Sequence, residues 1–452
     1  MVSGKSNRWV PSPRPTDRLV RAWHAFESLE WSRGAVLLAT AALAMVLANS
    51  PLGPGYQRVL QTPVGFVIGS FARTASLHAW IDDALMVVFF FVIGLEIKRE
   101  VLVGELSTAR KAALPIIAAA GGMLVPAAIY LAINAGGAGQ HGWGIPVATD
   151  IAFALGVLAL VRSRVPAGLK VFLMALAIAD DIGAMLVIAL AYSSGLNLAW
   201  LALALVPLAV LVACNRLRVD SPWPYAVAGL AFWFCFLGSG LHATVAGVIV
   251  ALTIPASALL PTESFIEGAR RHIDEIENCH VPGTRMLGDG GESALKRQVG
   301  RASRHSLAPL QRMENALAPI ADFAVLPLFA LANAGVHIAV GGPGLFTPVG
   351  LGVMLGLVLG KQVGVTCAAW LAVRSGAAQL PQGTGWRHIY GAAWLAGIGF
   401  TMSMFVANIA FSGPTLADEA KLGVMAASVV AGAGGWIYFR LVAPVRQERS
   451  AR

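Results

Sequence analysis

The chain has 452 residues, of which 57% are hydrophobic and only 13% are charged, and its mean hydropathy is +0.69. This composition excludes an ordinary soluble protein and predicts an all-α polytopic membrane protein. The net charge of +9 does not indicate nucleic-acid binding, because the basic residues are sorted among the loops between apolar segments.

Apolar runs long enough to cross a bilayer as helices recur along the chain, and they predict about twelve transmembrane spans. Residues 1–33 form a basic cytoplasmic tail without the short apolar core of a secretory signal, spans 1–8 occupy 34–256, and a cytoplasmic loop covers 257–312. Spans 9–12 occupy 313–442, and 443–452 form a cytoplasmic tail. The spans lie near 34–50, 82–101, 112–134, 143–161, 168–192, 197–215, 222–238, 240–256, 314–334, 347–373, 387–411 and 418–442.

Lysine and arginine are distributed unevenly between the two sides of the predicted membrane. Loops after even-numbered spans hold nineteen of them, whereas loops after odd-numbered spans hold two, Arg58 and Arg73. Cytoplasmic loops of membrane proteins are enriched in these residues. The pattern therefore predicts a multi-pass protein of the bacterial inner membrane with both termini in the cytoplasm.

The long loop 257–312 carries an apolar periodicity between residues 263 and 279 that is typical of an amphipathic surface helix. A solvated linker and a regulatory surface are both consistent with this loop. The four cysteines fall in apolar spans or in this charged loop and do not form a disulfide framework.

The fourth predicted span contains polar residues beside a helix breaker. Pro146 lies just before Thr149 and Asp150, so this span is expected to kink or unwind there. Unwound backbone is tolerated at membrane depth only where it faces a cavity or the protein interior. Asp150 is then expected to cap the following half-helix or to face the cavity.

The fifth span places two adjacent aspartates, Asp180 and Asp181, in the middle of an otherwise apolar segment. One carboxylate at that depth costs roughly 2.5 kcal/mol or more, and intramembrane acids typically mark ion or proton pathways. Loss of water and a neighbouring like charge favour protonation, whereas a bound cation favours the ionised form. Protons and Na⁺ or Li⁺ are therefore expected to compete for the same oxygens, which at an alternately exposed site is sufficient for an antiporter. If two protons leave when one Na⁺ binds, the exchange is electrogenic.

The tenth span carries Lys361 at mid-depth, and an aspartate of the fifth span is its expected counter-ion. A buried Asp180–Lys361 pair that only fixes helix packing is the alternative. Glycines at a four-residue period, from Gly352 to Gly364, predict close approach of another helix. The eleventh span has glycines and hydroxyls at 396–404, so it too is expected to be interrupted. Two interrupted spans predict inverted-topology repeats, spans 3–5 and 10–12, whose broken helices cross at mid-membrane.

Seven sequence segments resemble the NhaA family of bacterial sodium/proton antiporters, in the family's order and over residues 81 to 403. They are Ile81–Glu100 (IDDALMVVFFFVIGLEIKRE), Ala148–Gly156 (ATDIAFALG), Ala177–Gly183 (AIADDIG), His242–Val250 (HATVAGVIV), Leu326–Gly335 (LPLFALANAG), Leu359–Lys361 (LGK) and Gly397–Ser403 (GIGFTMS).

This resemblance implies a role for each matching position. Asp181 would be the principal cation ligand and proton carrier, and Asp180 its neighbour, paired with Lys361 in one state. Thr149 and Asp150 would line the broken fourth span and compensate the helix dipoles. A pH-responsive cytoplasmic entry funnel would comprise Asp83, Glu96, Arg99, Glu100, His242 and Glu314.

Some of these roles have structural alternatives. The acids and the arginine of the funnel also fit ordinary interfacial charges near helix ends, and His242 also fits a hydrogen-bonded packing residue. The chain has Asn315 and Ala318 where the family pattern carries histidines after Glu314, so pH sensing there does not carry over. Asp322, inside the ninth span, matches no motif.

Other functional classes fit the sequence less well. An intramembrane aspartyl protease needs a Gly-x-Gly-Asp motif and aspartates on two facing helices, and a channel does not suit Lys361 within the acidic site. A cation-coupled symporter of an organic anion is the remaining alternative. The sequence thus predicts a transporter and not an enzyme, without a cofactor, whose partners are Na⁺, Li⁺, H⁺ and the lipid bilayer. The segment 51–81 could form the contact of a homodimer.

Overall fold

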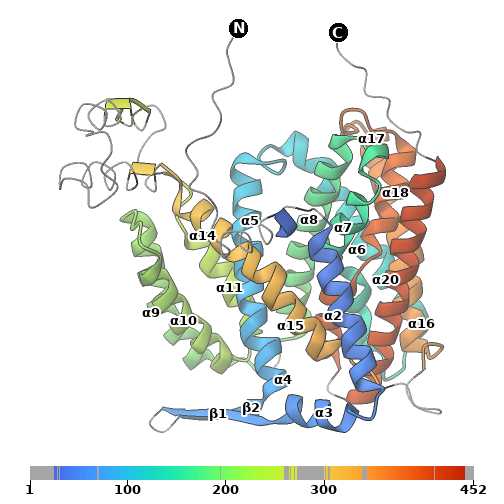
Figure 1. The fold of residues 1–452 in the computed structure, drawn as a ribbon, viewed down its shortest axis with the longest axis horizontal. Coiled ribbons are helices and arrows are strands. Elements are labelled where there is room, and N and C mark those ends of the chain that lie inside the picture. Colours follow the sequence, from blue (N-terminus) through green and yellow to red (C-terminus); the bar gives the residue numbers. More distant parts are fainter. Residues whose placement is uncertain are drawn as a thin grey trace, which may run out of the picture. The chain divides into compact units, whose positions relative to one another are not determined.

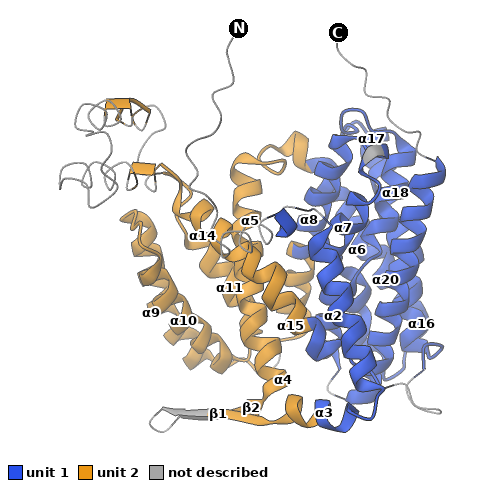
Figure 2. Cartoon of the chain, viewed as in Figure 1, with its two compact units in different colours: residues 1–56, 113–181, 330–452 blue, residues 57–112, 182–329 orange. Residues whose placement is uncertain are grey.

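The computed structural model is built almost entirely of helices (Figure 1). It describes residues 25–27, 29, 31–68, 71–193, 195–258, 264, 266–268, 270–271, 300, 302–303, 306–337, 344–411 and 413–442. Most of the predicted surface helix at 263–279 lies outside the described residues. The chain divides into two compact units, coloured separately in Figure 2.

Unit 1 comprises residues 1–56, 113–181 and 330–452. Its elements, some of which continue into unit 2, are α2 (Ser32–Ala48), α3 (Gly53–Gln61), α6 (Ala109–Asn134), the 3₁₀ helix Gln140–Val147, α7 (Ile151–Ala159), the 3₁₀ turn Arg162–Arg164, α8 (Ala167–Ala191), α16 (Pro348–Leu355), the π turn Gly356–Gly360, α17 (Lys361–Arg374), α18 (Trp386–Ala396), α19 (Phe400–Ala410) and α20 (Pro414–Val442).

Unit 2 comprises residues 57–112 and 182–329. Its elements are β1 (Pro63–Ile68), β2 (Phe71–Ser76), α4 (Leu77–Trp80), the π turn Ile81–Leu85, α5 (Met86–Val103), α9 (Leu198–Arg216), α10 (Pro222–Ser239), α11 (Ala243–Thr253), α14 (Pro309–Ile320), the π turn Ala321–Val325 and α15 (Leu326–Asn333), which ends in unit 1.

Among the described residues, seven helices are long and apolar enough to cross a membrane, and the count rises to nine if each of two bent pairs is one span. The predicted second, seventh and eighth spans coincide with α5, α10 and α11, which do not pass this test. Four charged residues lie in α5, and α11 has only 11 residues. Large apolar side chains such as Leu124, Leu190 and Leu205 are exposed, as expected of a surface that faces lipid. The count of twelve spans stays a prediction.

The predicted glycine face of the tenth span is confirmed within unit 1. A side chain at Gly364 would meet the carbonyl oxygen of Gly121 on α6, and one at Gly360 would lie 2.7 Å from the Cα atom of Pro126. Helices in a membrane associate largely through such close packing, because lipid is as apolar as their side chains. The glycines therefore allow α17 to lie directly against α6.

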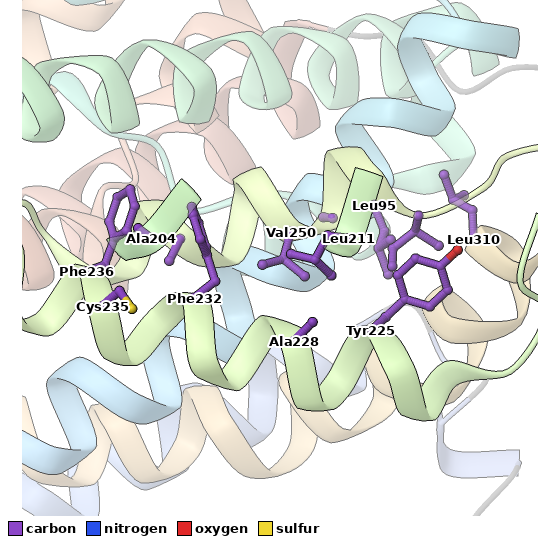
Figure 3. Packing of buried hydrophobic residues seen from close by; sticks show 13 residues of the cluster. Leu95, Ala204, Leu211, Tyr225, Ala228, Phe232, Cys235, Phe236, Val250 and Leu310 are labelled. Carbon is purple, nitrogen blue, oxygen red and sulfur yellow. The ribbon is translucent and has the colours of Figure 1, made fainter. Parts of the chain in front are cut away.

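Unit 2 has an apolar core formed by α5, α9, α10 and α11 (Figure 3). The Phe232 and Phe236 rings on α10 lie 4.7 Å apart between centroids. Helix α10 begins with Pro222 and ends at Gly240, whose φ of 82° places it in the left-handed region that terminates helices.

The antiparallel hairpin β1–β2, in which Pro63 is opposite Ser76, was not part of the all-α prediction. The hairpin lies between the first two apolar spans. The prediction used the length of apolar runs, which does not detect short strands. The all-α description therefore requires this one correction.

Candidate functional site

The fourth span is interrupted between the 3₁₀ helix Gln140–Val147 and α7. Ala148 and Asp150 have extended backbone, and the Asp150 carboxylate accepts a hydrogen bond of 3.0 Å from the backbone N–H of Phe153. This is the expected helix cap: an N-terminal carboxylate satisfies an N–H group that has no partner inside the helix. The backbone between Val147 and Ile151 is free to bond elsewhere.

The eleventh span is interrupted as well, because α18 ends at Ala396, α19 begins at Phe400, and the two helices are bent by 46°. Hydrogen bonds join this break to the break in the fourth span. The backbone N–H of Asp150 donates to the Ile398 carbonyl at 2.7 Å. In return, the Asp150 carboxylate accepts from the backbone N–H of Thr401 at 3.1 Å and from its hydroxyl at 2.5 Å. One buried carboxylate thus caps both α7 and α19.

Asp180 and Lys361 form an ion pair in unit 1. The Lys361 ammonium lies 2.5 Å from Oδ2 of Asp180, and both side chains have zero exposure. The Thr149 hydroxyl lies 2.7 Å from the same carboxylate oxygen and 2.8 Å from the Ala396 carbonyl. Because a hydroxyl has one hydrogen, Thr149 donates to only one of these acceptors at a time. Among the described residues, Oδ1 of Asp180 has no hydrogen-bond partner.

Asp181 follows Asp180 on α8 and is 2% exposed. Successive side chains on an α-helix point about 100° apart, so the two carboxylates leave α8 in different directions. The structure therefore brings Thr149, Asp180 and Lys361 into contact, with Asp181 as the next residue and Asp150 one residue from Thr149.

The predicted funnel residues belong to unit 2, where most of them surround one arginine. The Arg99 guanidinium lies 3.1 Å from Glu314, 3.4 Å from Glu100 and 3.8 Å from Glu96. Lys98 does not join them: its ammonium donates to the carbonyls of Leu252 and Ile254 at 2.7 and 2.5 Å, at the end of α11.

Asp83 and His242 lie away from this arginine cluster in the chain, whereas Asp322 lies near enough to Glu96 to interact with it electrostatically. Asp83 lies in the π turn Ile81–Leu85, and Asp322 lies in the π turn Ala321–Val325. His242 precedes α11 and hydrogen-bonds the backbone of Tyr192, which fits the packing alternative.

Sequence reasoning missed two contacts. Thr401 was part of a segment noted only for its hydroxyls, and its bond to Asp150 joins positions 251 residues apart. Tyr390 donates a hydrogen bond to Gln362, the residue after Lys361, and neither residue belongs to a motif. The one available signal was the pair of hydroxyls, Thr401 and Ser403, beside glycines at membrane depth.

The chain is similar to known proteins over nearly its whole length. Residues 24–439 match the family model described as Na⁺/H⁺ antiporter 1. The Na⁺/H⁺ antiporter NhaA of Oleidesulfovibrio alaskensis is 46% identical over 441 residues, which are 97% of this chain and 98% of the relative. The Na⁺/H⁺ antiporter NhaA of Acidithiobacillus ferrooxidans is 47% identical over 412 residues, 90% of this chain and 94% of the relative.

Proposed function

The chain belongs to the Na⁺/H⁺ antiporter 1 family, and from this premise we propose that it exchanges cytoplasmic Na⁺ or Li⁺ for external protons at Asp180 and Asp181. Its apolar helices and its bacterial relatives indicate a multi-pass protein of the inner membrane. This is a family of transporters and not of enzymes.

The observation that carries the proposal is the buried contact of Thr149, Asp180 and Lys361. An ammonium already occupies one oxygen of the Asp180 carboxylate at 2.5 Å, deep inside unit 1. Na⁺ can take the place of the Lys361 ammonium, because both cations bind carboxylate oxygens. We propose that Na⁺ displaces the ammonium from Asp180 during the cycle, while Thr149 turns its hydroxyl hydrogen to the Ala396 carbonyl and offers its oxygen to the ion.

Asp181 is the proposed principal ligand and proton carrier. A second carboxylate one residue away supplies the negative charge that a cation needs when Lys361 stays charged nearby. When Na⁺ leaves, Asp181 takes up a proton, and Asp180 either takes up a second proton or pairs again with the Lys361 ammonium. If two protons exchange for one Na⁺, charge moves in every cycle, and the membrane potential contributes about 2.3 kcal/mol per charge per 100 mV.

The two interrupted spans are the proposed framework of the site. We propose that they cross at mid-membrane as equivalent parts of inverted repeats, since each is the middle span of its predicted repeat. The ends of half-helices carry partial charges. Asp150, which caps both α7 and α19, offsets the two partial positive charges there and leaves the neighbouring carboxylates for the ion.

The arginine cluster of unit 2 is the proposed pH-responsive entry funnel. Three carboxylates, those of Glu96, Glu100 and Glu314, share the one guanidinium of Arg99. When one of the three carboxylates is protonated, it loses its charge, and the Arg99 guanidinium binds the other two more strongly. The cluster responds to pH in this way. Asp83 and His242 complete the proposed set, and a homodimer formed through the segment 51–81 stays a prediction.

Everted membrane vesicles from cells without their own antiporters test the exchange. A fluorescent probe reports the pH gradient while Na⁺, Li⁺ and K⁺ are added in turn, from mildly acidic to alkaline pH. We expect Na⁺ and Li⁺ to dissipate the gradient in the wild type. Asp181→Asn should lower this activity at least about 30-fold, because removing one partner of a buried charged contact costs about 2–5 kcal/mol.

Asp418→Asn is the matched control, since Asp418 is a half-buried aspartate of α20 outside the proposed site. It should retain most of the exchange. If no cation dissipates the gradient at any pH while the wild-type protein is present in the membrane, the proposed function is wrong.

A further inference from the structure

Two buried polar residues begin α17, directly after the π turn Gly356–Gly360. Lys361 has zero exposure and Gln362 is 6% exposed. Because successive residues on an α-helix point about 100° apart, these two side chains serve different neighbours. Lys361 reaches Asp180 on α8, whereas Gln362 reaches Tyr390 on α18.

The carboxamide of Gln362 is hydrogen-bonded to Tyr390. Its Oε1 accepts a hydrogen bond of 2.9 Å from the Tyr390 hydroxyl, and its Nε2 has no partner among the described residues. One turn further along α17, the Thr366 hydroxyl is also buried and has no partner in the described part of the chain. Incompletely satisfied groups of this kind are rare in folded proteins and call for an explanation beyond stability.

The start of α17 needs a contact that fixes the rotation of the helix about its axis, because Lys361 must point toward Asp180. A π turn is a rare, locally widened turn, and it frequently occurs at functional sites. A change of one residue in its register would rotate everything after it by about 100° and turn the Lys361 ammonium away from Asp180. On the α6 side, the atoms nearest to a Cβ added at Gly360 or Gly364 belong to Pro126, Gly121 and Val125, and none of them is a hydrogen-bonding side-chain group.

We infer that the Tyr390–Gln362 hydrogen bond makes Gln362 a positioning residue that holds Lys361 against Asp180. The bond fixes the rotation of α17 immediately after the π turn, on the face opposite the glycines that contact α6. This inference rests on the proposed exchange. Neither Gln362 nor Tyr390 contacts the carboxylates, so both act through Lys361.

The consequence is a change in the Na⁺ concentration that half-saturates exchange. The charged or titratable groups of the elements around the start of α17 include Asp180 and Asp181 of α8, Asp150 before α7, Arg387 and His388 of α18, and Asp418 and Lys421 of α20; α6 presents Gly121 and Gly122. When Lys361 moves off Asp180, Na⁺ no longer has to displace the ammonium from that carboxylate. At an alkaline pH, where protons compete weakly, the half-saturating Na⁺ concentration therefore falls.

Tyr390→Phe tests this inference with the least disturbance. It removes the hydroxyl and keeps the ring that packs edge-to-face on Tyr438, 5.3 Å away between centroids. We expect the half-saturating Na⁺ concentration at alkaline pH to fall by about threefold, as the loss of one net hydrogen bond allows. Gln362→Met should give the same shift, and the double variant should give no more than either single variant, because all three remove one contact.

Tyr225→Phe is the control, because it removes a tyrosine hydroxyl that bonds the Val219 carbonyl at 3.2 Å in unit 2. Its half-saturating Na⁺ concentration should match the wild type. An unchanged half-saturating Na⁺ concentration in both Tyr390→Phe and Gln362→Met, or an equal change in Tyr225→Phe, overturns the positioning role. Absence of exchange in the wild type overturns the proposed function instead, so the two failures are distinct.

Discussion

At the scale of single residues, Asp150 has the largest number of defined hydrogen bonds in the candidate site. Its carboxylate accepts from the Phe153 N–H, the Thr401 N–H and the Thr401 hydroxyl, and its side chain is 2% exposed. A buried N–H group without an acceptor costs about 1–3 kcal/mol. The interrupted spans are therefore stable only because one acid serves both of them.

Asp150→Ala tests this dependence. We expect the free energy of unfolding to fall by about 3 kcal/mol, because two helix N-termini lose their cap at about 0.5–2 kcal/mol each and the Thr401 hydroxyl loses its acceptor. Thermal unfolding of the purified protein in detergent measures the change. Asp150→Asn keeps one acceptor oxygen and should lose less. Equal stability of Asp150→Ala and the wild type would contradict the double-cap interpretation.

Residue partners were predictable from the sequence only where chemistry left few choices. A mid-membrane ammonium requires an anion, and the fifth span carries an acid pair, so charge alone predicted one of these two aspartates as the counter-ion of Lys361. The choice of Asp180 came from the family resemblance. The contact of Asp150 with Thr401 could not be predicted, because the sequence offers many N–H and hydroxyl donors that could bind the Asp150 carboxylate. Which of them meets Asp150 depends on how α7 and α19 pack.

At the scale of elements, the interruptions were predictable and the π turns were not. Pro146 and the glycines at 397 and 399 are local signals, and the helices end beside them. The π turns at Ile81–Leu85, Ala321–Val325 and Gly356–Gly360 have no such signal, because one inserted residue is compatible with the same apolar pattern. Each contains or precedes a charged residue of the membrane spans: Asp82, Asp83, Asp322 or Lys361.

Gly364→Leu tests the contact of α17 with α6. Its side chain would collide with the Gly121 backbone, which cannot move aside as a flexible side chain does. We expect destabilisation of at least about 3 kcal/mol, at the upper end for overpacking, and a lower yield of folded protein. Gly413→Ala is the control, since nothing lies within 4 Å of its added Cβ. The thermal midpoints of both variants in detergent give the comparison, and an unchanged midpoint for Gly364→Leu would contradict the close packing.

At the scale of the whole molecule, the sorting of basic residues predicts the orientation of every loop. Two arginines follow odd-numbered spans, against nineteen basic residues after even-numbered spans. Length and apolarity of single helices recover only seven to nine spans among the described residues. They miss α5 because charges cluster at its predicted cytoplasmic end. Charge distribution and helix length therefore carry different information, and only the first reports sidedness.

Reporter fusions test this orientation and the parity of the span count together. Green fluorescent protein folds in the cytoplasm and alkaline phosphatase is active in the periplasm, so each reports one side. Fused after Val442, the fluorescent protein should be bright and the phosphatase inactive; fused after Gly137, in the predicted loop that follows the third span, the two signals should reverse. A cytoplasmic amino terminus and a cytoplasmic carboxyl terminus require an even number of crossings. With a cytoplasmic amino terminus, a periplasmic carboxyl terminus would need an odd number of crossings and would therefore exclude twelve spans. Reversed signals at both fusion sites would instead contradict the orientation that the basic residues predict.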